Sequence, residues 1–226
     1  MLRFIQVTFI IAISNFAVLA SASDATAPSE VEYLVDILTK SNLDLEVTTV
    51  KENCAAWPIL YGEDRQSDLW TLVSFETVID CLNTGQIVDA RDQHGATALM
   101  WASGNSKNLK IIDLLLKRYS EVNIRSEGGM TALHLAAMFN DDEQILMRLI
   151  EAGANINARN KIGQTPLHLA ALKNPNPKVI RVLLESGANG AEKTAKGKTP
   201  FDLAKNNNPK IVGTYAYWAL NDAQYE

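Results

Sequence analysis

The sequence has few of the side chains that build metal sites, catalytic centres or disulfide scaffolds. It contains only three histidines and two cysteines in 226 residues. Two cysteines are too few for a fold held together mainly by disulfides, so the core must come from packing. Acidic residues outnumber basic ones by 26 to 21. An acidic protein has no general positive field to hold a phosphate backbone, so we expect no nucleic-acid partner.

Catalytic and metal-binding patterns are also missing. The histidines and cysteines are widely separated in the sequence, whereas a zinc site needs three or four converging ligands. The recurring glycines are spaced as turns and do not cluster as in a phosphate-binding loop. The acidic run at residues 141–143 has too few ligands for Ca²⁺ and suits a helix start. We therefore expect no catalytic residue, no metal and no cofactor.

The first 22 residues have the pattern of an export signal. Arg3 supplies a positive start, residues 4–19 are mostly apolar, and residues 20–22 read Ala-Ser-Ala, as at a cleavage site. A retained membrane anchor is the weaker alternative, because the apolar run is short and includes polar residues. We expect a secreted or periplasmic protein that leaves the membrane after cleavage. The absence of any Asn-x-Ser/Thr site favours a bacterial periplasm over a eukaryotic secretory route.

Export makes Cys54 and Cys81 a candidate disulfide. The bond would close a loop of 26 intervening residues, for which the chain-entropy model gives about 3 kcal/mol of stabilisation. The alternative is two separately buried thiols that act as small hydrophobic side chains. Both interpretations are open, and a bond would clamp the N-terminal extension onto the first repeat.

One motif recurs with a period of 34 residues. Each copy has a glycine, a threonine two residues later, an apolar residue two further on, and an alanine three after that. The four copies start at Gly95, Gly129, Gly163 and Gly197. Four coincident copies indicate repeated structural units and not chance.

Each copy carries the signals of a helix start. Glycine permits the backbone conformation of a turn, threonine is a good N-cap, and Pro166 and Pro200 occupy a first helical position. A second helix such as 179–184 follows a short connection, and Gly153 and Gly187 are predicted to end second helices in the left-handed conformation. One helix pair cannot bury its apolar face alone, so neighbouring pairs must stack.

These units resemble the ankyrin repeat family. Residues 165–171 read Thr-Pro-Leu-His-Leu-Ala-Ala, residues 183–188 read Leu-Leu-Glu-Ser-Gly-Ala, and residues 153–159 carry the turn between units. The resemblance covers the chain from about residue 92 to its end. The family repeat is usually 33 residues, and comparison with it places the extra residue between the two helices of each unit.

The resemblance implies an all-α fold, an α-solenoid of helix-turn-helix units with hairpin-like loops. Residues 29–66 do not carry the repeat, but the helical spacing of their apolar residues, as at Val31, Leu34 and Leu38, predicts an N-terminal helix that caps the stack. It implies that His134 and His168 tie adjacent turns together through hydrogen bonds. The expected organisation is a signal peptide (1–22), a helical extension (23–66), a degenerate repeat (67–91), three repeats (92–126, 127–160 and 161–193) and a C-terminal cap (194–226).

Three places depart from the repeat pattern. Tyr119 stands where later units have Gly153 and Gly187, so either it adopts a left-handed conformation or that helix ends differently. The degenerate repeat has only its second helix clearly marked, and its first helix is expected within residues 67–72. The last second helix is expected over residues 211–220.

Ankyrin-like stacks bind partners through their loop tips and the exposed side of the first helices, which form a concave face. The residues expected to contact a partner are His94, Met130, Met138, Phe139, Lys161, Ile162, Gln164, Lys173, Lys196 and Lys198. The remaining positions of this face are Gln93, Ala96, Gly104, Asn105, Glu127, Leu172, Lys205 and Asn206. The methionines and phenylalanine would form an apolar patch, and the lysines would make the C-terminal half locally basic. Alternatively, Met138 and Phe139 pack against the connection between helices and the lysines only aid solubility.

The predicted function is binding another protein, one with an acidic patch, without catalysis. Alternatives are a periplasmic stress or redox accessory protein that uses Cys54 and Cys81, and a secreted effector that acts on host protein. An enzyme within residues 23–91 is a more distant alternative, because that stretch has no histidine.

Overall fold

The computed structural model describes residues 74–225, which all belong to the unit formed by residues 49–226. Within these residues the chain forms nine α-helices and no strand, which confirms the predicted all-α class. In chain order they are α4 (Phe75–Asn83), α5 (Ala98–Asn105), α6 (Leu109–Lys117), α7 (Ala132–Phe139), α8 (Glu143–Glu151), α9 (Pro166–Lys173), α10 (Pro177–Glu185), α11 (Pro200–Asn207) and α12 (Tyr215–Ala223).

Threonine caps begin the first helix of each repeat. Each threonine side chain accepts a hydrogen bond from the backbone N–H three residues later, which satisfies a donor that the helix itself leaves unpaired. The caps are Thr97, Thr131, Thr165 and Thr199. Pro166 and Pro200 occupy the first helical position, as their sequence context predicts.

The second helices end in a left-handed residue. Gly153 and Gly187 have φ of 87° and 93°, and the backbone N–H after each glycine bonds back into the last turn. Tyr119 also adopts this conformation, with φ of 65°, which settles the choice that the sequence left open. Its helix therefore ends like the others, with a tyrosine in the strained position.

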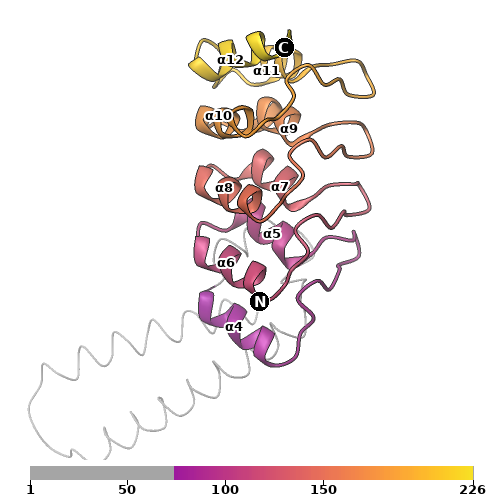
Figure 1. Cartoon of the computed structure of the whole chain (residues 1–226), viewed down its shortest axis with the longest axis vertical. Coiled ribbons are helices and arrows are strands. Elements are labelled where there is room, and N and C mark those ends of the chain that lie inside the picture. Colours follow the sequence, from indigo (N-terminus) through magenta and orange to yellow (C-terminus); the bar gives the residue numbers. More distant parts are fainter. Residues whose placement is uncertain (1–73, 226) are drawn as a thin grey trace, which may run out of the picture. The chain divides into compact units, whose positions relative to one another are not determined.

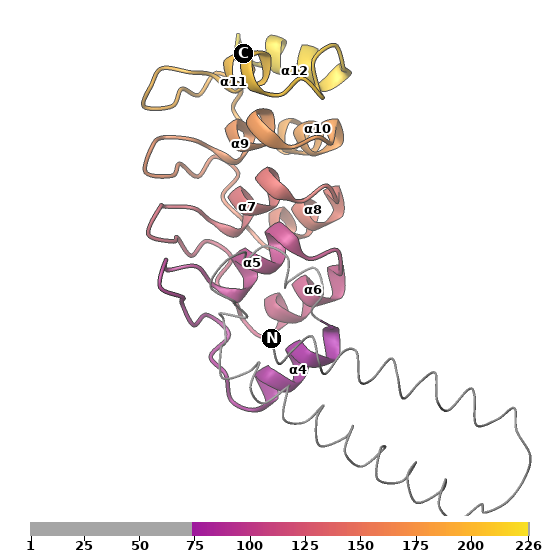
Figure 2. The same cartoon turned by 180° about the vertical axis from the view of Figure 1, so that it is seen from behind.

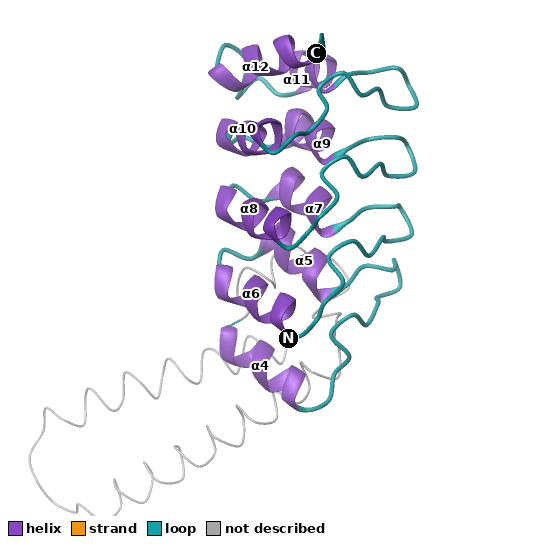
Figure 3. Cartoon of the chain, in the orientation of Figure 1, coloured by secondary structure: helices purple, strands orange, loops and turns teal. Residues whose placement is uncertain are grey.

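The helices of the described part stack in two columns (Figure 1). First helices α5, α7, α9 and α11 contact their neighbours in one column, and α4, α6, α8, α10 and α12 do so in the other. Loops project from the side of the first helices in both views (Figures 2 and 3). This arrangement is the helical solenoid that the repeats predict.

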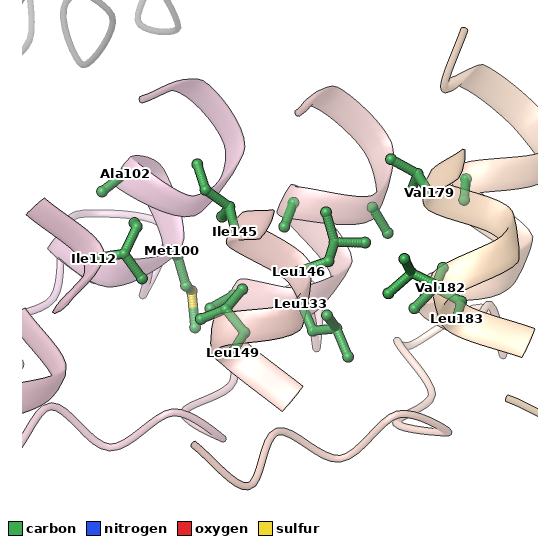
Figure 4. Close-up of a cluster of buried hydrophobic side chains, with 14 of the residues drawn as sticks. Met100, Ala102, Ile112, Leu133, Ile145, Leu146, Leu149, Val179, Val182 and Leu183 are labelled. Carbon is green, nitrogen blue, oxygen red and sulfur yellow. The ribbon is translucent and has the colours of Figure 1, made fainter. Parts of the chain in front are cut away.

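The core runs through the stack as one cluster of buried side chains from Val78 to Leu220. Figure 4 shows Leu133 and Leu146 lying between Met100 on one side and Val182 on the other. Each repeat thus buries its apolar side against the next, because a single pair exposes too much apolar surface.

The last helix begins later than expected. Residues 209–213 form turns, and α12 starts at Tyr215 instead of Ile211. Gly213 has φ of 79°, which is incompatible with a helix, although Ile211 keeps its buried place in the core. The helix also runs to Ala223, past the predicted end at Leu220.

Several expectations lie outside the described residues: the export signal (1–22), the helical extension (23–66), the helix within 67–72, and Cys54. They stay predictions. Every helix in the described part is too short or too polar to cross a lipid bilayer.

Candidate protein-binding surface

The loops between repeats bond directly to one another. They comprise residues 84–97, 118–131, 152–165 and 186–199. At their tips, the backbone N–H of Lys161 donates to the carbonyl of Gly128 at 3.0 Å, and that of Ala195 donates to Ile162 at 3.0 Å. The bond from Glu127 to the carbonyl of His94 is 2.9 Å long. Consecutive loops are therefore held in register at the tips where partner contacts are predicted.

Glycine is required at these tips for two reasons. Gly129 and Gly163 have φ of 75° and 76°, which other residues rarely adopt. A Cβ at Gly129 would also lie 3.0 Å from the backbone nitrogen of Lys161, and one at Gly163 would lie 3.0 Å from that of Ala195. The recurring glycine thus allows close approach of neighbouring loops as well as the turn itself.

An arginine of each loop reaches the next loop. Arg91 donates to the carbonyl of Arg125 at 3.2 Å, and Arg125 donates to that of Arg159 at 2.5 Å. Arg159 donates to the carbonyl of Lys193 at 2.7 Å and pairs with Glu192. These arginines were not among the predicted site residues, although they recur at the period of the repeat.

The two motif histidines connect adjacent repeats, as the family resemblance implies. Nδ1 of His134 accepts from the backbone N–H of Thr131 at 3.2 Å, and Nε2 lies 3.1 Å from the carbonyl of Gln164 in the next loop. His168 makes the equivalent contacts with Thr165 and Lys198. Burial lowers the pKa of His134 to about 4, and it also lowers the pKa of His168. Both imidazole rings are therefore neutral at pH 7, and their role is to connect adjacent repeats.

A row of buried asparagines forms a second connection that sequence reasoning missed. The side-chain amide of Asn140 donates to the carbonyls of Ser103 and Ser106 at 2.9 and 2.8 Å. Asn174 and Asn208 make equivalent pairs of bonds to the preceding repeat. The available signal was their spacing, since all three asparagines recur every 34 residues.

The structure places the predicted apolar contacts unequally. Phe139 at the end of α7 is 52% exposed, and Ile162 at a loop tip is 58% exposed. Met130 and Met138 are half-buried. The Lys173 ammonium lies 5.8 Å from the centre of the Phe139 ring, close enough for a cation–π contact.

The polar members of the predicted face are accessible. Gln164 is half-buried and the other side chains are exposed. The exposed members are His94, Lys161, Lys173, Lys196 and Lys198.

Two further positions expected on this face are buried, and the prediction was wrong for them. Ala96 is 4% exposed, and its backbone N–H donates to Asp92 at 2.8 Å. Gly104 is buried because α7 packs on it, and a Cβ there would lie 3.3 Å from the Cβ of Leu135. Both small residues serve packing between repeats.

The side chains of residues 74–225 bring no three His, Cys, Asp or Glu residues close enough to hold a metal ion. Loop tips that are held in register, beside exposed apolar and basic side chains, can contact the surface of another protein.

Comparison with known proteins gave one family. A model described as ankyrin repeats in three copies matches residues 70–160 and 133–214, and these stretches together cover more than half of the chain. A search of curated proteins gave no match to the chain.

Proposed function

The chain belongs to the ankyrin repeat family, and from that premise we propose that it binds a partner protein through its loop tips and first helices without catalysing a reaction. Ankyrin repeats indicate a protein–protein interaction module. The observation that carries the proposal is Phe139, a large apolar ring that is 52% exposed on this face. An aromatic side chain in this position suits the centre of an interface.

The proposed partner presents an acidic patch beside an apolar anchor. Lys161, Lys196 and Lys198 are exposed near the tips of two consecutive loops. Their charges would attract an acidic partner from a distance, while Phe139 with Met138 would supply much of the affinity on contact. Lys173 beside the Phe139 ring joins the two parts of this surface.

The proposed location is outside the cytoplasm, in the periplasm or the medium, and rests on the pattern of residues 1–22. There we propose a permanent Cys54–Cys81 disulfide as a staple in preference to a cycling redox pair. The support is burial, since Cys81 is fully enclosed in the core and redox-active thiols are accessible. Mass measurement before and after reduction, with thiol labelling of the unfolded but unreduced protein, tests this: labelling without reductant would contradict it.

The binding face is tested by a double variant, Met138→Ala with Phe139→Ala. The partner is first captured from the exporting compartment, identified by mass spectrometry and purified. Its affinity for the double variant should then fall more than tenfold, because both apolar contacts are lost.

Met147→Ala is the matched control, since Met147 is 45% exposed but lies on α8 in the other column. It should leave the affinity unchanged. Equal affinity of the double variant and the wild type, with both folded by circular dichroism, would remove the proposed binding face.

A further inference from the structure

A pocket with a volume of about 750 Å³ lies between α10 and α12. Its lining includes Arg181 and Glu185 of α10 and Tyr215, Trp218 and Asp222 of α12. These helices belong to the column away from the projecting loops (Figure 1). The pocket is therefore separate from the proposed binding face.

The displacement of α12 shapes this pocket. Helix α10 spans Pro177–Glu185, so one period later a helix would span 211–219, but α12 spans Tyr215–Ala223. The helix is thus moved by one turn along the chain. Its last turn lies on the loop after α10, where a Cβ at Gly190 would lie only 2.5 Å from the Cβ of Ala223.

Aromatic rings form one wall of the pocket. Trp218 is 56% exposed and Tyr215 is 69% exposed, so parts of both rings are open to a ligand. The ring of Tyr217 meets Trp218 nearly perpendicularly with 5.3 Å between centroids, and Tyr217 in turn packs on Phe201 at 5.0 Å. Trp218 therefore belongs to a row of packed rings that extends through Tyr217 to Phe201 of α11.

The electrostatics of the pocket favour a positive group. Glu185 and Asp222 contribute two carboxylates, against one guanidinium from Arg181. The C-terminal ends of α10 and α12 lie at the lining, and neither helix has a basic residue in its last turn. The negative ends of both helix dipoles therefore lie at the lining, and Tyr215, the first residue of α12, places the positive end of that helix at the lining as well. Arg181 is itself directed to Glu185, with 4.0 Å between Nε and the carboxylate oxygen.

We propose that this pocket binds a guanidinium or alkylammonium group carried by a peptide segment of a partner protein. The exposed faces of Trp218 and Tyr215 attract a cation through their negative π surfaces, and the two carboxylates pair with it. The volume exceeds that of the cation and lies within the range of ligand sites, so the flanking peptide has room. The group proposed for this pocket is positively charged, whereas the patch of the partner that is proposed to contact the binding face is negatively charged.

Fluorine NMR of the full chain labelled with 5-fluorotryptophan tests the proposal. The chain has four tryptophans, and Trp218→Phe assigns the relevant signal. The probe is the tripeptide acetyl-Gly-Arg-Gly-amide, with acetyl-Gly-Glu-Gly-amide as its anionic counterpart. We expect the arginine peptide to shift the Trp218 signal saturably and the glutamate peptide to leave it unchanged.

Three variants separate this site from general attraction to an acidic protein. Glu185→Gln should lower the affinity for the arginine peptide at least threefold, whereas Glu151→Gln, the same change one repeat earlier, should not alter it. Arg181→Ala should raise the affinity at least twofold, because it removes the competing cation. The proposal is overturned by an unsaturable shift, by equal losses in both glutamate variants, or by tighter binding of the glutamate peptide.

Discussion

At the scale of single residues, His134 can hold two repeats together only as a neutral ring. Its Nδ1 accepts a hydrogen bond from the backbone N–H of Thr131, and its Nε2–H donates to the carbonyl of Gln164. A proton on Nδ1 would place two N–H donors against each other in a buried site. Burial disfavours the protonated ring and lowers the pKa of His134 to about 4.

Acid should therefore weaken the fold through His134. The folded pKa of about 4 lies below the ordinary value of 6.5, so the unfolded chain binds the proton more readily. The contribution of neutral His134 to the free energy of unfolding is complete above pH 6.5, declines as the pH falls, and is lost at about pH 4. The free energy of unfolding should fall by roughly 3 kcal/mol over this range. Urea unfolding at pH 7, 5.5 and 4.5 measures it. His134→Gln should flatten this dependence, and an unchanged slope in that variant would contradict the assignment.

Tyr119 should cost stability through its backbone conformation. Its φ of 65° places a large residue in the left-handed region, and its side chain is 90% exposed and so gains little from packing. We expect Tyr119→Gly to raise the free energy of unfolding by about 1 kcal/mol in urea titrations. Tyr119→Ala keeps the Cβ and the strain, so it should stay close to the wild type. Equal gains in both variants would mean that the exposed ring, not the backbone, is the source.

At the scale of the helices and their connections, Asn174 should be among the most sensitive polar residues. Its amide donates to the buried carbonyls of Ala137 and Asn140 at 3.0 and 2.7 Å. Asn174→Ala leaves both acceptors buried without this donor, so we expect a loss of about 3 kcal/mol in urea unfolding. Asn206→Ala is the control, since Asn206 is exposed and bonds only to its own helix. Similar small losses in both variants would show that the connection between repeats adds no stability.

The helix starts were predictable because their signals are local. A threonine cap and a proline at the first position act within one turn, and each predicted cap is found in place. The start of α12 was not predictable in the same way. Ile211 has the apolar character of a helix residue, and it is buried, but the following turn and Gly213 keep it out of the helix.

Contacts between repeats were harder to predict, because they depend on which neighbour a residue meets. Asn140 reads as an ordinary surface residue in a connection, and only the preceding repeat makes it a buried donor. Ala96 and Gly104 were predicted to lie on the binding face for the same reason. The loop and the helix that cover them belong to the neighbouring repeat, and the sequence of one repeat does not reveal them. The exposed Phe139 and Ile162 were predictable, since no such neighbour covers them.

At the scale of the stack, stability depends on the interfaces between neighbouring repeats, and these interfaces are unequal. His134 connects the repeat of α7 and α8 to the next, and His168 repeats this connection one unit later. Met100 occupies the equivalent position in the repeat of α5 and α6 and cannot make those hydrogen bonds. That repeat also contains the strained Tyr119. Within residues 74–225, the repeat of α5 and α6 should therefore open more easily than those that follow.

Hydrogen exchange followed by mass spectrometry measures this gradient directly. Backbone amides of α5 and α6 should exchange faster than those of α7 to α10, because they open with a smaller free energy. His134→Gln removes the connection to the next repeat, so it should bring the exchange of α7 and α8 closer to that of α5 and α6 while α10 changes less. Uniform protection across α5 to α10 would show instead that these repeats unfold as one cooperative unit, and the missing histidine contacts would then have no local effect.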